Sequence, residues 1–269
     1  EIRFCDWSSD VCSSDLTASN LPAADWQPRD KTGLGSNNWV IGGRKSTTGM
    51  PLLANDPHRE VQNPALRYWV HLVAPGWNVI GATEPGMPGV TIGHNEHVAW
   101  GFTIINGDQQ DIYVEHTDAQ NANRYLHKGE WRDMRIDVEE IAVKGAAPVR
   151  FEVKTTLHGP LLHEDRARNR AYASRWTGYE VGGQGYYGSF GLMQAKNWQE
   201  FTAAAGNAWY GAHNLVYADV TGDFGYVSTG LIPQRPNWNG LFPVPGHEGK
   251  YEWADRKSTR LNSSHRTGS

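Results

Sequence analysis

One serine, Ser36, stands in the stretch GLGSNNWVIGG between a glycine and an apolar segment typical of a β-strand. A serine hydroxyl is a weak nucleophile until a neighbouring base accepts its proton. Cutting the Gly35–Ser36 bond would supply that base, because an α-amine titrates at about 7.7 to 8.0 and is partly unprotonated near neutral pH. Gly35 suits such a cut, since glycine tolerates the strained backbone of an internal acyl shift. The alternative is that Gly35 and Ser36 form an ordinary turn.

Other ways of building a hydrolytic site find less support in the chain. There is no Gly-x-Ser-x-Gly motif, and the 11 histidines are scattered without a local signature that would assemble a serine triad. His94 and His97 in HNEH have the spacing of two metal ligands, which keeps a metal-dependent hydrolase as a rival hypothesis. No third ligand follows at a diagnostic spacing, so we interpret HNEH as a turn between strands.

Composition limits the classes of partner. The chain has 269 residues, 39% of them hydrophobic and 20% charged, with a net charge of -4. It has no basic stripe interleaved with aromatic residues, so nucleic acid is not expected as a partner. It has no apolar run of about 18 to 20 residues, so no membrane span is expected. The composition is that of a globular protein.

The two ends differ in character from the rest. Residues 1–16 and 256–269 show neither helical nor strand periodicity and resemble translated sequencing-adapter sequence, so we predict that both are non-native. Cys5 and Cys12 both lie in the leader, where a small disulfide loop is the alternative. Residues 17–35, with their prolines and mixed charges, are predicted to be an extended linker.

Short alternating runs separated by turn residues predict antiparallel strands along most of the chain. One helix is predicted over 197–206, because Asn197 and Glu200 have the spacing of a capping box and Gly206 can end the helix. The fold class is therefore α+β with sheets large enough to stack. The expected strands are 38–42, 67–73, 78–82, 90–93, 98–103, 112–115, 136–143 and 149–157, with hairpins over 126–131 and over 215–220 and 224–229.

A series of blocks then carries a family resemblance. In order they are SNNWVIGG, PLLANDPH, TIGHNEHVAWGFT, GDQQDIYVE, TLHGP, AKNWQEF, HNLVYADVTGDFGYVSTG and PVPG. Together they resemble the penicillin acylase family of N-terminal-nucleophile hydrolases. The resemblance implies an αββα sandwich of stacked antiparallel sheets, incomplete in this fragment. It also implies a precursor that excises a linker and yields an α chain and a β chain beginning with the catalytic serine, here Ser36. Residues 36–255 would be the N-terminal part of the β chain, and 17–35 the end of the linker or propeptide.

The resemblance implies a role for each matching position. Ser36 attacks an amide carbonyl with its own amine as base, after autocatalytic cleavage between Gly35 and Ser36. The backbone N–H of Ile104 and the side-chain amide of Asn214 stabilise the oxyanion. His58 lies beside the nucleophile, and Arg235 orients the amine or the substrate.

Further positions concern the substrate and a metal. Arg59, Ile92 and Phe102 match substrate-binding positions, and they depart from the aromatic pocket of phenylacetyl-selective members. Asp108, Gln110 and Asp111 resemble a calcium-binding stretch, with a solvated acidic turn as the alternative. Catalysis would need no cofactor, and calcium would be structural.

The expected reaction is hydrolysis of a linear amide, such as a β-lactam side chain, an N-acyl homoserine lactone or a related acyl amide. The expected partners are the α chain of the same precursor and a small acyl amide, in the periplasm or outside a bacterium. Because strands without neighbours expose unpaired edges, we expect the polypeptide by itself to be neither stable nor active. The alternative from another class is a non-enzymatic β-rich binding domain.

Overall fold

The computed structural model describes residues 35–105, 107–179, 188–207, 212–254, 259–260 and 264–267. The predicted leader 1–16, the linker up to residue 34 and most of the tail from 256 lie outside these ranges. In the described part no helix has the length and apolar character needed to cross a membrane.

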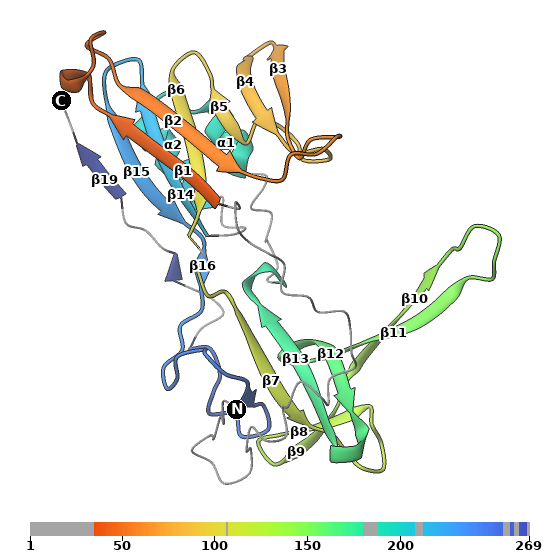
Figure 1. Cartoon of the computed structure of the whole chain (residues 1–269). Helices are drawn as coiled ribbons and strands as arrows, with labels where there is room; N and C mark the ends of the chain where they lie inside the picture. Colours follow the sequence, from red (N-terminus) through yellow and green to blue (C-terminus); the bar gives the residue numbers. More distant parts are fainter. Residues whose placement is uncertain are drawn as a thin grey trace. The chain divides into compact units, whose positions relative to one another are not determined.

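The largest sheet among the described residues is antiparallel and has seven strands (Figure 1). Its strand order is β19-β15-β14-β6-β5-β4-β3. β14 lies between β6 and β15, so Asn214 is opposite Thr103 on one side and Ser228 on the other. The strands are β3 (Tyr68–Ala74), β4 (Trp77–Thr83), β5 (Ile92–His94), β6 (Val98–Ile104), β14 (His213–Asp219), β15 (Phe224–Thr229) and β19 (Ser264–Thr267).

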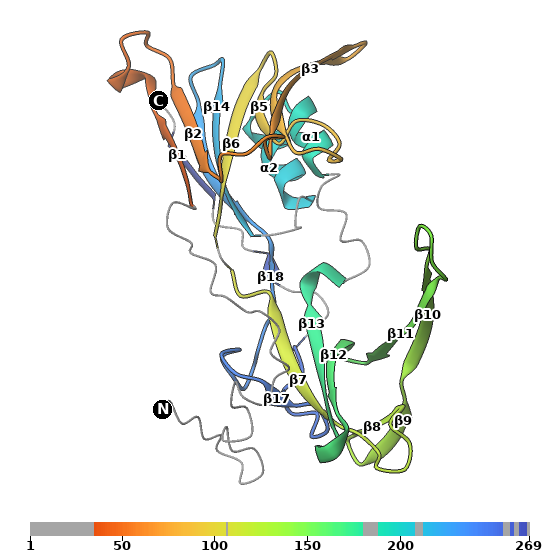
Figure 2. The same cartoon turned by 45° about the vertical axis from the view of Figure 1, so that its right-hand side comes forward.

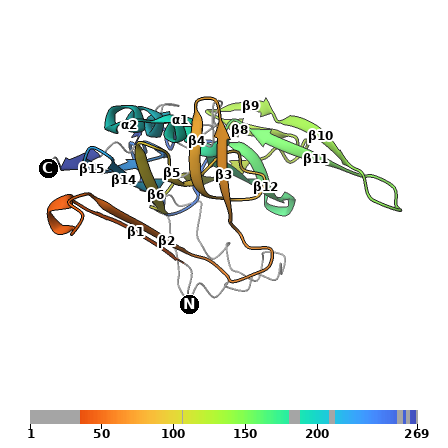
Figure 3. The ribbon, with the colours of Figure 1, turned by 90° about the horizontal axis from the view of Figure 1, so that it is seen from above.

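Two helices, α1 (Gly188–Gln194) and α2 (Trp198–Asn207), cover one face of this sheet. Phe201 of α2 packs on the buried ring of Tyr217 in β14, with ring centroids 4.9 Å apart. The predicted capping box of α2 is confirmed, because the N–H of Glu200 donates to Asn197 Oδ1 at 2.9 Å. Figure 3 shows the helices on one side of the sheet and the strands β1 and β2 on the other.

The opposite face is covered by a hairpin of β1 (Gly35–Ile41) and β2 (Leu52–His58), joined through a short 3-10 turn at Gly43–Lys45. Asn55 of β2 ties this hairpin to β6: its side chain accepts from the N–H of Phe102 at 2.9 Å and donates to the Phe102 carbonyl at 3.1 Å. A Cβ on Gly101 would lie 2.7 Å from the Cβ of Asn55, so glycine at 101 permits this close approach.

A second sheet of six strands has the order β10-β11-β12-β13-β7-β17 (Figure 2). Its pairs are antiparallel except that β17 runs parallel to β7. Tyr113, Ala173 and Val244 form its small buried core. The strands are β7 (Gln110–His116), β10 (Arg135–Ile141), β11 (Val149–Thr156), β12 (Gly159–Asp165), β13 (Arg170–Trp176) and β17 (Val244–Pro245).

Smaller elements complete the described chain. β8 (Arg124–His127) and β9 (Glu130–Asp133) form the predicted hairpin, whose two turn residues Lys128 and Gly129 both have positive φ. β16 (Leu231–Ile232) pairs with β18 (Thr259–Arg260). Two 3-10 turns occupy Arg166–Arg168 and Thr177–Tyr179.

The α+β class is confirmed, whereas the expectation of one helix is wrong. α1 has the sequence GSFGLMQ, in which two glycines weaken the helical pattern, and packing of Leu192 and Met193 into the core compensates. β2 also escaped prediction, because its NDPH is typical of a turn; Pro57 is tolerated since β2 is an edge strand of a two-stranded sheet.

Candidate active site

Ser36 lies in a strand, not in a turn. Gly35 and Ser36 are the first two residues of β1, opposite His58 and Pro57 of β2, so the turn alternative is wrong. The side chain of Asn38 donates to the Asn214 carbonyl at 3.0 Å and therefore faces the seven-stranded sheet. Because side chains alternate along a strand, Ser36 shares the face of Asn38 and points toward the same sheet.

The backbone N–H of Ile104 is placed to act as a donor. Ile105 donates to the Ala212 carbonyl, so the adjacent pair Ile104 and His213 is a pair without mutual hydrogen bonds. The N–H of Ile104 consequently points away from β14, on the side where β5 pairs with β6 only as far as Trp100. The backbone N–H and carbonyl of Phe102, two residues earlier in β6, also point away from β14, and both bind the side chain of Asn55.

The register brings Ser36 toward this donor. Asn55 binds Phe102, and two residues further along each strand stand Pro57, which is opposite Ser36, and Ile104. Figures 1 and 2 show β1 beginning beside the end of β6. The predicted nucleophile and the predicted backbone donor are therefore at the same end of the stacked hairpin and sheet.

Asn214 presents its amide in a fixed orientation on the hairpin face of the sheet. Its Nδ2 donates to Thr103 Oγ1 at 3.1 Å, and its Oδ1 accepts from the Tyr226 hydroxyl at 2.5 Å. Because Tyr226 takes the amide oxygen, the amide nitrogen keeps its donor role. The side chain of Asn214 thus has the chemistry required of an oxyanion donor. The backbone carbonyl of Asn214 also anchors β1 by accepting from Asn38.

His58 and Arg59 both reach the peptide bond that precedes Ser36. His58 Nε2 donates to Asp56 at 2.8 Å, and its Nδ1 lies 3.6 Å from the position that a Cβ on Gly35 would take. Arg59 Nη1 donates to the Gly35 carbonyl at 3.3 Å and to the His58 carbonyl at 2.9 Å. A basic nitrogen and a cationic donor therefore flank the Gly35–Ser36 bond.

The other two predicted substrate residues lie on the sheet. Ile92 is half-buried at the start of β5. Phe102 packs against the core on the helix side, and its ring contacts His213 with centroids 4.6 Å apart. The contacts of the described chain do not join Arg59, Ile92 and Phe102 into one pocket, so their shared role stays a prediction.

The predicted calcium stretch is paired with an arginine. Arg235 Nε donates to Asp111 at 2.8 Å, and its Nη2 lies 3.1 Å from the carboxylate of Asp108. Trp253 Nε1 also donates to Asp111 at 2.6 Å. Burial raises the pKa of Asp111 above its usual value, although hydrogen bonds from Arg235 and Trp253 act in the opposite direction. The guanidinium thus pairs with both carboxylates, and the calcium site stays a prediction.

Arg235 is held by ion pairs and by an aromatic ring. Its ion pairs place it at the start of β7, and its guanidinium lies over the ring of Trp238 at 5.5 Å. A shallow pocket of about 470 Å³ opens beside it, lined by Gly107, Asp108, Gln109, Gln110, Ile112 and Trp176. The predicted contact of Arg235 with the amine or the substrate stays a prediction.

HNEH forms a tight reversal between β5 and β6, as interpreted from the sequence. Asn95 Oδ1 accepts from the N–H groups of His97 and Val98, and the ring of His94 contacts the Asn95 carbonyl. Neither histidine belongs to the metal-ligand cluster found in the described residues. The structure therefore gives no support to a hydrolase that uses His94 and His97.

Sequence reasoning missed the residues that hold the site together. Asn55, Thr103 and Tyr226 belong to no catalytic motif; Asn55 binds the backbone of Phe102, and Thr103 and Tyr226 hold the amide of Asn214. The available signal was the polar residues that follow the apolar start of LLANDPH, beginning with Asn55.

Comparison with known proteins identifies the group to which this arrangement belongs. The model of the family described as Penicillin amidase matches residues 5–264. The chain belongs to the penicillin amidase family. Among its curated relatives, penicillin G acylase of Escherichia coli is 38% identical over 226 residues, covering 81% of this chain and 26% of that protein.

Other members of the penicillin amidase family match similarly. Acyl-homoserine lactone acylase QuiP of Pseudomonas aeruginosa is 33% identical over 230 residues, covering 81% of this chain and 27% of that protein. The solved structure of a thermostable penicillin G acylase from Alcaligenes faecalis matches with a TM-score of 0.77 at 30% identity, covering 86% of this chain and 41% of that chain. The chain spans about a quarter of the length of the curated relatives it matches.

This penicillin amidase segment confirms the fold expected from the resemblance, in incomplete form. Helices α1 and α2, the seven-stranded sheet and the hairpin of β1 and β2 form three stacked layers. The hairpin, which carries Ser36, is the layer on the face of the seven-stranded sheet opposite to the helices.

Proposed function

We propose that the chain is the N-terminal part of the catalytic β chain of an acylase, which hydrolyses a linear amide through Ser36 after cleavage of the Gly35–Ser36 bond. The single observation that carries the proposal is the position of Ser36 at the start of a strand, on the sheet-facing side of the hairpin, at the same end as Ile104, whose N–H points away from β14. Family membership and relatives that are acylases of penicillin G and of acyl-homoserine lactones support it.

Maturation would be an intramolecular acyl shift. The Ser36 hydroxyl attacks the Gly35 carbonyl carbon, a C–O bond forms, the C–N bond breaks and the amine of Ser36 is released; water then hydrolyses the ester. Arg59 donates to the oxygen on which negative charge develops. The hydroxyl proton passes to the released amine; His58 shares the face of Gly35 and Asp56, opposite to that of Ser36, so we give it no part in this transfer.

Turnover would repeat this chemistry on the substrate. The released amine takes the proton of the Ser36 hydroxyl as it attacks the amide carbonyl, and then protonates the leaving amine. The N–H of Ile104 and the amide of Asn214 stabilise the oxyanion. Water, activated by the same amine, clears the acyl-enzyme and releases the carboxylic acid. No step depends on calcium, and the calcium site at Asp108, Gln110 and Asp111 stays a prediction.

Arg59 also bears on the choice of acyl group. Before cleavage, its guanidinium binds the carbonyl on the acyl side of the scissile bond, and after cleavage the acyl group of a substrate occupies that side. A cationic lining favours acyl groups that carry an oxygen acceptor over purely aromatic ones. We therefore propose that phenylacetyl amides are poorer substrates than acyl amides with a keto or carboxylate oxygen near the scissile bond.

The proposed setting follows the relatives. One of them is described as a proenzyme, penicillin acylase 2 of Pseudomonas sp. strain SE83, which is 32% identical over 234 residues. We propose an α chain from the same precursor as partner and a periplasmic or secreted location in a bacterium. The reaction would remove side chains from β-lactams or inactivate acyl-homoserine lactone signals.

The test uses the complete precursor that carries this chain. Wild-type precursor should be cut before Ser36 and should hydrolyse an acyl amide, whereas Ser36→Ala should remain uncut and inactive. Ser46→Ala is the matched control, because Ser46 lies in the exposed turn after β1 and bonds only locally to Thr48. Amide hydrolysis by uncut Ser36→Ala protein would overturn the proposal.

A further inference from the structure

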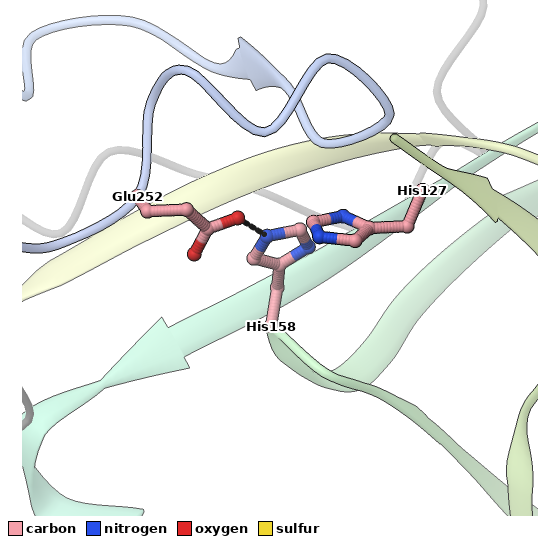
Figure 4. Close-up of side chains that lie close together, drawn as sticks. All are labelled: His127, His158 and Glu252. Carbon is pink, nitrogen blue, oxygen red and sulfur yellow. Dashed lines mark hydrogen bonds and ion pairs between the residues drawn. The ribbon is translucent and has the colours of Figure 1, made fainter. Parts of the chain in front are cut away.

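Two histidines and a glutamate to which the proposed reaction gives no role meet beside the six-stranded sheet. His127 ends β8, His158 stands in the turn between β11 and β12, and Glu252 follows β17. One ligand atom of each lies within 4.8 Å of the others. Figure 4 shows the ring of His158 between the carboxylate of Glu252 and the ring of His127. Three elements distant in sequence thus bring metal-ligating side chains together.

A hydrogen bond at Nδ1 fixes the tautomer of His127, whereas His158 lies between two carboxylates. His127 Nδ1 lies 3.2 Å from the Gly246 carbonyl, which can only accept, so Nδ1 carries the hydrogen. His158 Nδ1 lies 2.8 Å from Glu115 Oε1. Both Nδ1–H groups therefore donate to an oxygen; Nε2 of His127 is open to a ligand, and Nε2 of His158 becomes so when its hydrogen leaves. His158 Nε2 is 2.9 Å from Glu252 Oε1.

Glu252, and Glu115 behind His158, are also oriented by hydrogen bonds. Arg175 Nη1 donates to Glu252 Oε2 at 3.0 Å, which leaves Oε1 facing the histidine. Thr156 Oγ1 donates to Glu115 at 2.6 Å, and the ring of Tyr113 stacks on His158 with centroids 3.9 Å apart. Each proposed ligand thus has a partner that orients it, the pattern of outer contacts found around metal ligands.

A further observation points independently to a cation. Glu115 is fully buried, and its Oε2 has no hydrogen-bond partner within the described chain. A buried carboxylate oxygen without a partner is costly, and a positive ion held by the adjacent histidine lowers that cost. His158 is also fully buried, so water does not screen the two charges.

We propose that His127, His158 and Glu252 bind a Zn²⁺ ion. Two imidazole nitrogens and one carboxylate oxygen form a donor set that suits Zn²⁺ better than calcium or magnesium, which prefer oxygen ligands alone. Binding forms bonds from His127 Nε2, His158 Nε2 and Glu252 Oε1, and the hydrogen between His158 and Glu252 leaves as a proton to solvent. Ser36 and its donors take no part, so the site is independent of amide hydrolysis.

The test measures Zn²⁺ bound to the chelator-treated complete precursor after equilibrium dialysis. Wild type should bind one equivalent, and replacement by Co²⁺ should give visible absorption bands of a bound ion. His127→Asn and His158→Asn should lose both signals, because an asparagine amide can replace the Nδ1 donor but not Nε2. Glu115→Gln, which changes the hydrogen-bond partner of His158 Nδ1 and leaves the three ligands in place, should weaken Zn²⁺ affinity about 10- to 100-fold.

His163→Asn is the matched control, since His163 is a half-buried histidine of β12 outside the cluster. It should bind Zn²⁺ as wild type does, and circular dichroism of each metal-stripped variant checks that it is folded. If His158→Asn fails to fold, His127→Asn alone decides. Wild type without bound Zn²⁺, or His127→Asn with undiminished Zn²⁺, would overturn the proposal and leave His158 as a charged bridge between Glu115 and Glu252.

Discussion

Replacing Asn55 by alanine tests whether the contact between hairpin and sheet positions Ser36. The side chain of Asn55 makes two half-buried hydrogen bonds to the backbone of Phe102 and one exposed bond to the Asn37 carbonyl. The bond to Asn37 lies within the hairpin, so only the two bonds to Phe102 hold it on the sheet; at about 1 kcal/mol each, their loss weakens docking of the hairpin by about 2 kcal/mol. Since 1.4 kcal/mol is tenfold, the undocked population should rise roughly 30-fold.

Hydrogen exchange measures this population directly, through the amides of β1 and β2 in uncut Ser36→Ala precursor. Exchange should accelerate there by the same factor, and cleavage before Ser36 should slow in the Asn55→Ala protein that retains the serine. Asn78→Ala is the control, because the Asn78 amide bonds to His71 and Glu96 at the surface of β4. In Asn78→Ala protein the amides of β1 and β2 should exchange at the wild-type rate. If they also do so in Asn55→Ala protein, the docking argument fails.

Three further outcomes follow from the described contacts. Asn214→Ala in matured enzyme should lower kcat about 10²- to 10³-fold with little change in KM, and an unchanged kcat would remove Asn214 from the oxyanion site. Arg59→Met should slow cleavage before Ser36 about tenfold in a time course of precursor processing, because a charged hydrogen bond to the Gly35 carbonyl is worth about 1.5 kcal/mol. Burial alone would raise the pKa of Asp219, but hydrogen bonds led by that of Thr221 outweigh it and hold the pKa below its usual value. Asp219 therefore contributes stability above a pH of about 4 that is lost as the pH falls through the lower folded-state pKa, and Asp219→Asn should flatten thermal stability in that window.

Local signals predicted the elements whose sequence and packing agree. The capping box of Asn197 and Glu200 predicted α2, and the alternation in β14 and β15 predicted their hairpin. α1 and β2 could not be predicted this way, because their glycines, Asn55 and Pro57 favour other local structures and only tertiary contacts stabilise them.

The site divides in the same manner. Ser36 could be predicted from the chemistry of a terminal serine, and Ile104 and Asn214 only through a family resemblance. The direction of the Ile104 N–H depends on the pairing of β6 with β14, which no single stretch encodes. Arg235 was expected near the amine, yet its partners Asp108 and Asp111 lie in a stretch that the sequence assigned to calcium.

The most direct test of the account is the mass of the peptide that contains Ser36, isolated from matured protein quenched during turnover of an acyl amide. The account predicts a peptide that begins with Ser36, has a free α-amine that reacts with an amine-specific label, and carries the acyl group on its hydroxyl. A peptide still joined through Gly35, or an acyl group on any other residue, would contradict it.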